Sequence, residues 1–168
     1  MPGSLVGEPA PSSFREGAMK ARDLMKAARV VGPGDSCRTL IEAFADPEVR
    51  GVAVVTDVGE LVGLITDQDM LAALLPSYVV DDEALARVLE EDAGARLSAR
   101  LADRQTRDLI DETSREEAVV APDDTLIEVA DTMVRSRGPA VLVVEGKRVL
   151  GVITADVLLK AVLSPKAP

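Results

Sequence analysis

The sequence contains no histidine and only one cysteine, Cys37. Without imidazoles or a second thiol, the chain cannot form an internal disulfide, a zinc cluster or a histidine-based catalytic triad. Such sparing use of cysteine is typical of proteins in a reducing compartment. We therefore predict no metal site, no catalytic residues and no bound cofactor.

Long apolar runs and an excess of positive charge are lacking too. No stretch approaches the roughly 20 apolar residues that span a bilayer, and the N-terminus lacks the apolar core of a signal peptide. The formal net charge of −10 opposes nonspecific binding to nucleic acid or to an anionic membrane, because both require a basic face. We predict a cytoplasmic protein with neither kind of partner.

The sequence does contain an internal repeat. One apolar run closes with Gly63-Leu64-Ile65-Thr66, and another closes 88 residues later with Gly151-Val152-Ile153-Thr154. Matching landmarks precede the two runs: Arg22-Asp23-Leu24 and Arg107-Asp108-Leu109, then Val30-Val31-Gly32-Pro33 and Val119-Val120-Ala121-Pro122. Half of such a chain would be only marginally stable alone, because small domains bury too little of their surface. The repeat therefore predicts one fold built from two similar halves, with any site in the cleft between them.

Each half has the same order of predicted elements. A short Val-Val strand is followed by an amphipathic helix, two brief strands joined by a glycine-containing turn, and a second helix. The first half has a helix from Ser36 that ends by Pro47, strands at 52–55 and 61–65, and a helix over 67–75. The second half has a helix from Thr125, strands at 140–144 and 149–153, and a last helix that reaches Leu163. The predicted fold class is α/β (α+β).

Composition divides the chain further. Residues 1–18 are rich in proline, glycine and serine and are expected to form a disordered leader. The two repeats are expected at 19–78 and 106–164, with an acidic helical insert at 79–105 and a short tail at 165–168. The leucines of the insert fall at multiples of four, which favours an amphipathic helix. That helix either packs on the core with a solvated acidic face or binds a partner.

The two copies resemble a known family at this point. A strand-helix-strand-strand-helix unit that ends in Gly-hydrophobic-Ile-Thr at a strand-to-helix junction is similar to a cystathionine-beta-synthase (CBS) domain. Two such units, over about residues 19–164, resemble the pair called a Bateman module. The resemblance implies two pseudo-symmetric repeats packed sheet to sheet. It also implies a regulatory module that binds AMP, ADP, ATP or S-adenosylmethionine between the repeats, forms a homodimer and acts on an unidentified protein target.

Thr66 and Asp69 are the candidate ligand contacts of the first copy. Thr66 is expected at a helix N-terminus, where free backbone N–H groups favour a phosphate, and Asp69 could accept hydrogen bonds from a ribose. The resemblance implies the same roles: in the family, the threonine at this position contacts phosphate or ribose and the aspartate holds the ribose. The same Thr-x-x-Asp spacing is also that of a capping box, in which each side chain bonds the backbone of the other. The sequence leaves both interpretations open.

The second copy departs from the pattern after Thr154. Val157 stands at the ribose-holding position, and Asp156 comes one residue early. One residue rotates a helical side chain by about 100 degrees, so we expect Asp156 to point away from that position. The sequence therefore predicts one competent ligand site in each chain.

Further ligand contacts are suggested by position. Arg50 and Arg137 precede the central strands, where the resemblance implies basic contacts to phosphate, and the backbone of Val30 and Val31 is where it implies contact with adenine. Other candidate cations precede the first strand: Lys20, Arg22, Lys26 and Arg29. For each of these cations, an ordinary surface charge is the favoured interpretation over a ligand contact.

Two functions from different classes remain, and a third is set aside. The first is a sensor of an adenosyl ligand; the second is a structural adaptor that dimerises and binds no small molecule. An enzyme would need catalytic groups that face one another. Asp67 and Asp69 do not face one another, because side chains two residues apart on a helix point in different directions.

Overall fold

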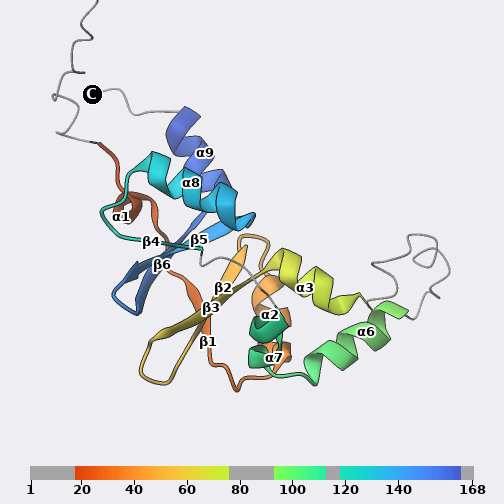
Figure 1. The fold of residues 1–168 in the computed structure, drawn as a ribbon. Helices are drawn as coiled ribbons and strands as arrows, with labels where there is room; N and C mark the ends of the chain where they lie inside the picture. The colour runs from red at the N-terminus through yellow and green to blue at the C-terminus, as the bar shows by residue number, and fades with distance from the viewer. Residues whose placement is uncertain (1–17, 76–92, 113–117, 164–168) are drawn as a thin grey trace, which may run out of the picture.

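The fold consists of two three-stranded sheets, each covered by helices (Figure 1). The computed structural model describes residues 18–75, 93–112 and 118–163. The first repeat contains α1 (Ala21–Leu24), β1 (Arg29–Val31), α2 (Cys37–Phe44), β2 (Gly51–Val55), β3 (Leu61–Thr66) and α3 (Asp67–Leu74). The insert contributes α6 (Ala93–Ala102). The second repeat contains α7 (Thr106–Glu112), β4 (Val119–Val120), α8 (Leu126–Ser136), β5 (Ala140–Glu145), β6 (Arg148–Thr154) and α9 (Ala155–Leu163).

The two sheets have the same topology, which confirms the predicted fold class. In each sheet the first strand lies parallel to the second, and the second pairs antiparallel with the third. Both hairpins have a register shift near the end of the central strand, at Val54/Val55 and at Val143/Val144. Each hairpin turn holds a glycine at positive φ, Gly59 in one and Gly146 in the other. Only glycine adopts this backbone conformation without steric cost, so it fixes the turn position.

Capping side chains begin the helices where the sequence predicted them. Ser36 accepts a hydrogen bond from the backbone N–H of Arg38 at the start of α2. At the start of α8, Thr125 and Glu128 form a full capping box, and the Glu128 carboxylate accepts from the Thr125 backbone N–H at 2.8 Å. This bond holds the pKa of Glu128 below its usual value. The caps satisfy backbone donors that the first turn of a helix leaves unpaired.

The short helix at the start of each repeat packs on the opposite half. Ala21 of α1 is fully buried in the second core, beside residues of β4, β5, β6, α8 and α9. Leu109 of α7 is buried in the first core, where α7 contacts β3. Figure 1 shows α1 beside α8 and α9, and α7 beside α2. The sequence landmarks Arg22-Asp23-Leu24 and Arg107-Asp108-Leu109 therefore mark helices that the two repeats exchange.

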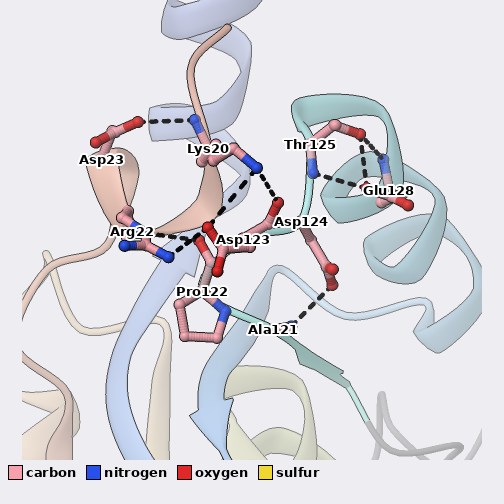
Figure 2. A network of polar contacts seen from close by, with 9 residues as sticks. All are labelled: Lys20, Arg22, Asp23, Ala121, Pro122, Asp123, Asp124, Thr125 and Glu128. Carbon is pink, nitrogen blue, oxygen red and sulfur yellow. Dashed lines mark hydrogen bonds and ion pairs between the residues drawn. The ribbon is translucent and has the colours of Figure 1, made fainter. Parts of the chain in front are cut away.

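Backbone hydrogen bonds fix both exchanged segments. The N–H of Ala21 donates to the carbonyl of Asp124 at 2.9 Å, and the N–H of Thr106 donates to the carbonyl of Asp35 at 2.9 Å. Side chains add to the first of these contacts (Figure 2). The ammonium group of Lys20 donates to the Asp123 carbonyl at 2.8 Å, and the Arg22 guanidinium pairs with the Asp123 carboxylate. Neither Lys20 nor Arg22 lies at the cleft between the repeats, because both are held against the loop before α8.

The insert covers the helices of the first half. Within the described residues, α6 contacts α2 and α3, and its Leu101 is buried in the first core. The part of the expected insert helix before residue 93 lies outside the described residues, as do residues 1–17 of the expected leader and the expected tail at 165–168. The arrangement of α6 matches the interpretation of a helix packed on the core. On the described part of the chain, no helix is long and apolar enough to cross a membrane.

The two repeat glycines allow each exchanged segment to approach a strand closely. A Cβ atom built on Gly151 would lie 2.6 Å from the carbonyl oxygen of Lys26 and 3.0 Å from the Cβ of Met25. A Cβ atom built on Gly63 would lie 2.6 Å from the Cδ1 of Ile110, the far end of a flexible side chain. Backbone cannot move aside as easily as a terminal methyl group.

We therefore expect Gly151→Ala to destabilise the fold by about 1 to 3 kcal/mol through overpacking. Gly63→Ala is the matched control and should cost less, since Ile110 can rotate away. Urea unfolding monitored by circular dichroism measures both changes. Equal losses in the two variants would contradict this account of the Gly151 contact.

Candidate functional site

A cleft of about 640 Å³ lies where the two repeats meet. Its walls come from four segments: the turn between α1 and β1, the segment before β2, the residue before β5, and the junction of β6 with α9. Lining residues are Lys26, Ala27, Arg29, Asp46, Pro47, Glu48, Val49, Arg50, Gly51, Pro139, Val152, Thr154, Ala155, Asp156, Leu159 and Lys160. The volume is within the range of small-molecule sites, about 300 to 1,000 Å³.

The exchanged segment of the first repeat forms one wall of this cleft. Lys26 pairs antiparallel with Val152 of β6, and each backbone N–H donates to the other carbonyl at 2.9 Å. The glycine at 151 permits this contact, as described above. Residues 26–29 therefore cross from the second sheet to the first, and the cleft lies beside this crossing.

The junction of β6 with α9 supplies the polar groups of the opposite wall. The Thr154 hydroxyl donates to the Asp156 carboxylate at 2.5 Å, and the Lys160 ammonium lies 3.5 Å from the same carboxylate. The hydrogen bond from Thr154 is the largest cause that holds the pKa of Asp156 below its usual value, and Lys160 adds to the effect. Asp156 is thus an anion that faces the cleft. Although Asp156 comes one residue early in the repeat pattern, its side chain bonds the Thr154 hydroxyl and lines the cleft.

Thr66 and Asp69 form a closed capping box in the first repeat. The Asp69 carboxylate accepts from the Thr66 backbone N–H at 2.8 Å and from the Thr66 hydroxyl at 2.7 Å. The Asp69 backbone N–H donates to the Thr66 hydroxyl oxygen at 3.3 Å. Both side chains are buried, with 2% and 5% of their surface exposed. The capping interpretation is thus present in the structure, while the ligand role of this pair stays a prediction.

The remaining predicted contacts are divided among several places. Arg50 and Thr154 line the cleft together. Val30 and Val31 do not: they line a separate, shallow depression with residues 55–57, and the residues just before them face the cleft instead. Arg137 is exposed at the C-terminus of α8 in a left-handed conformation, and it does not line the cleft.

The cleft carries both signs of charge, and most of its cations have an acidic partner. The Nη2 atom of Arg29 lies 3.7 Å from the Asp46 carboxylate, and the Nη1 atom of Arg50 donates to the Asp67 carboxylate at 2.9 Å. Lys160 pairs with Asp156. Within the described residues, Lys26 is the lining cation that makes no ion pair. The cleft is therefore close to electrically neutral, despite four cations in its walls.

Sequence reasoning missed the apolar walls of the site. Ala27, Val49, Pro139 and Val152 line the cleft but have no distinctive spacing. Val152 belongs to a repeat landmark, but no short motif marks the other three. Within the described residues, no group of three or more acidic or cysteine side chains is placed to hold a metal ion.

Comparison with known proteins defines the class of the protein. The CBS domain profile matches residues 21–76 and again residues 107–164. Together these matches cover more than half of the chain. The chain therefore belongs to the CBS-domain family, with two CBS domains in tandem, which confirms the predicted Bateman module.

Solved structures of the family share this fold. A CBS domain-containing protein of unknown function from Kribbella flavida is 36% identical, with a TM-score of 0.69 over 88% of this chain and all of the other. CBSX2 from Arabidopsis thaliana is 21% identical, with a TM-score of 0.68 over 89% of this chain and 97% of the other. A structure of CBSX2 in complex with AMP is 22% identical, with a TM-score of 0.62 over 88% of this chain and 98% of the other.

A curated relative is much longer than this chain. An uncharacterized protein of Methanocaldococcus jannaschii is 31% identical over 120 residues, which are 71% of this chain but 34% of the relative. The chain thus spans about a third of the length of the curated relative that it matches.

The Thr154–Asp156 contact predicts a measurable titration. Thr154→Val should raise the pKa of Asp156 toward its usual 3.8, because the hydroxyl donor is the main cause of the lowered value. A carboxyl with a lowered pKa stabilises the fold above its usual pKa, and this contribution is lost as pH falls through the lowered value. The pH dependence of unfolding in that acidic range should therefore shrink in the variant.

Carbon-detected NMR titration of the Asp156 carboxyl measures this shift. Thr56→Val is the control, because its hydroxyl accepts from the Glu60 backbone at the far hairpin. An unchanged Asp156 titration in Thr154→Val would contradict the assignment of the hydrogen bond.

Proposed function

We propose that this chain is a regulatory module that senses an adenosyl ligand, AMP, ADP, ATP or S-adenosylmethionine, in the cleft between its two CBS domains. The observation that carries the proposal is the composition of the cleft wall. Both repeats contribute to it, and it combines apolar side chains with an anion and several cations. Pairs of CBS domains are regulatory ligand-binding modules, and one protein of this fold is known in complex with AMP.

The cleft offers a complementary group for each part of such a ligand. Ala27, Val49 and Val152 provide apolar surface for a flat base. The Asp156 carboxylate can accept hydrogen bonds from ribose hydroxyls, since it is held as an anion. The ammonium of Lys26, which makes no ion pair within the described residues, suits a phosphate or a carboxylate.

The assignment of the ribose to Thr66 and Asp69 stands as a competing proposal. A ligand that bound there would have to replace the hydrogen bonds of the closed box, whereas Asp156 already faces the cleft. Mutation of Asp156 and of Asp69 in turn distinguishes a ribose site in the cleft from one at Thr66 and Asp69.

Ligand binding in the cleft would regulate by linking segments from both repeats. The turn at 26–29, the start of β2 and the start of α9 would all contact one molecule. A ligand that prefers one arrangement of these segments shifts the population toward it, and a protein partner can respond to that shift. We propose this role for a cytoplasmic, non-catalytic protein that needs no cofactor and binds neither nucleic acid nor membrane.

The first test is ligand binding by two charge-neutralising variants. AMP at 100 times its dissociation constant should add about 2.7 kcal/mol of stability. For a chain of this size, that should raise the melting temperature by roughly 5 to 11 °C. Asp156→Asn should weaken AMP binding at least about tenfold, because a hydrogen bond to a charged group is lost.

Asp69→Asn is the matched variant and should lower the melting temperature without ligand while it leaves AMP affinity unchanged. Calorimetric titration gives the affinities, and circular dichroism verifies folding. The reverse pattern would support the Thr66 and Asp69 site, and no binding of any of the four ligands would refute the sensor.

The second function, dimerisation, is favoured by apolar side chains on the outer helices. Ile127 and Val134 of α8 and Val162 and Leu163 of α9 are each more than half exposed, and α8 packs beside α9. Exposed apolar groups that gather on one surface commonly mark an interface. Since α6 covers α2 and α3 of the first half, we propose that a second copy of the chain docks on α8 and α9.

Val134→Asp should therefore shift the protein from dimer to monomer, because the dimer would have to bury an unpaired charge. Val58→Asp is the control: the two valines are equally exposed, 76% and 77%, but Val58 lies in the β2–β3 turn. Light scattering coupled to size-exclusion chromatography gives the mass. A wild-type monomer, or a Val134→Asp dimer, would refute this interface.

A further inference from the structure

Arg50 and Asp67 face each other across the start of the first hairpin. The antiparallel register places Gly51 opposite Thr66, so the next residues outward are Arg50 and Asp67. One guanidinium nitrogen of Arg50, Nη1, donates to the Asp67 carboxylate at 2.9 Å. Arg50 also lines the cleft. The ion pair thus connects the cleft between the repeats to the first turn of α3.

The second repeat has no charges at the equivalent place. Its register puts Ala140 opposite Thr154, so the corresponding residues are Pro139 and Ala155. They are joined by a backbone hydrogen bond of 2.9 Å from the N–H of Ala155 to the carbonyl of Pro139. The Arg50–Asp67 pair is therefore specific to the first repeat and is not required to build the hairpin.

The Asp67 carboxylate depends on Arg50 for its hydrogen bonding within the described residues. Its Oδ2 atom accepts from Arg50, while its Oδ1 atom is buried and makes no hydrogen bond within the described residues. Arg50 itself is 54% exposed on its side chain, and Asp67 is 26% exposed. If Arg50 turned fully toward a ligand, a partly buried carboxylate would lose its cation. Such a loss is unfavourable, because desolvated charge needs a partner.

We propose that Asp67 competes with the ligand phosphate for Arg50, so that this ion pair sets the preference of the cleft between phosphorylated and unphosphorylated adenosyl ligands. The proposal rests on the function proposed above and assigns Asp67 as a specificity-determining residue that does not itself line the cleft. Asp67 cancels the charge of Arg50 and also repels a phosphate placed beside it. Arg29 and Lys160 are also paired with acids, so the nearly neutral cleft attracts a phosphate less than its four cations would alone.

Removal of the competing charge is the test. Asp67→Asn should bind AMP and ATP about two- to fivefold more tightly than the wild type, the range measured for partly exposed ion pairs. Adenosine, which carries no phosphate, should bind both proteins equally. The gain for AMP should disappear when Arg50→Gln is combined with Asp67→Asn. Isothermal titration calorimetry at fixed ionic strength measures all three ligands with each purified protein.

Asp57→Asn is the matched control, since it removes the same charge from an exposed turn outside the cleft. It should leave all three affinities unchanged. Weaker AMP binding by Asp67→Asn would overturn the proposal, because Asp67 would then position Arg50 for the phosphate. An equal gain for adenosine, or an equal gain in Asp57→Asn, would also overturn it. If the wild type binds AMP but Asp67→Asn binds it identically, this inference fails alone; if the wild type binds none of the three probes, the proposed sensor fails with it.

Discussion

The exchange of the two lead-in helices is the contact on which the other features depend. Ala21 is buried only because α1 lies in the second core, and Leu109 is buried only because α7 lies in the first. Each half alone would lack a part of its core, and a unit of about 60 residues is already marginal in stability. The halves therefore fold as one body. Any ligand between them contacts parts of the chain that cannot separate without unfolding.

The cleft is a geometric consequence of that exchange. The chain must cross from the second half to the first between α1 and β1, and Lys26 pairs with Val152 on the way. Gly151 leaves room for this crossing, since a side chain there would meet the Lys26 carbonyl. The crossing, the start of β2 and the start of α9 then line the cleft. A glycine that the sequence offers as a repeat landmark is thus a packing requirement.

Pseudo-symmetry in the backbone coexists with asymmetry in charge. At the start of α3, Asp69 bends back to Thr66 and is buried, while at the start of α9, Asp156 bends back to Thr154 and faces the cleft. Capping and ligand binding use the same donors and acceptors, so the surroundings decide which role a residue of this motif can take. The two repeats therefore differ in charge at equivalent helix starts, because the acid of the second copy comes one residue earlier than that of the first.

The sequence by itself determined the repeat, the order of the elements from the first strand of each half onward, the caps at Ser36 and Thr125 and the turn glycines. These features depend on residues a few positions apart, whose dihedral preferences and hydrogen bonds are local. The tertiary structure alone decided that α1 and α7 change halves, that residues 26–29 rather than Val30 and Val31 line the cleft, and that Arg50 meets Asp67. Such contacts join segments distant in sequence, and they follow from how the two cores pack, which no short pattern of residues encodes.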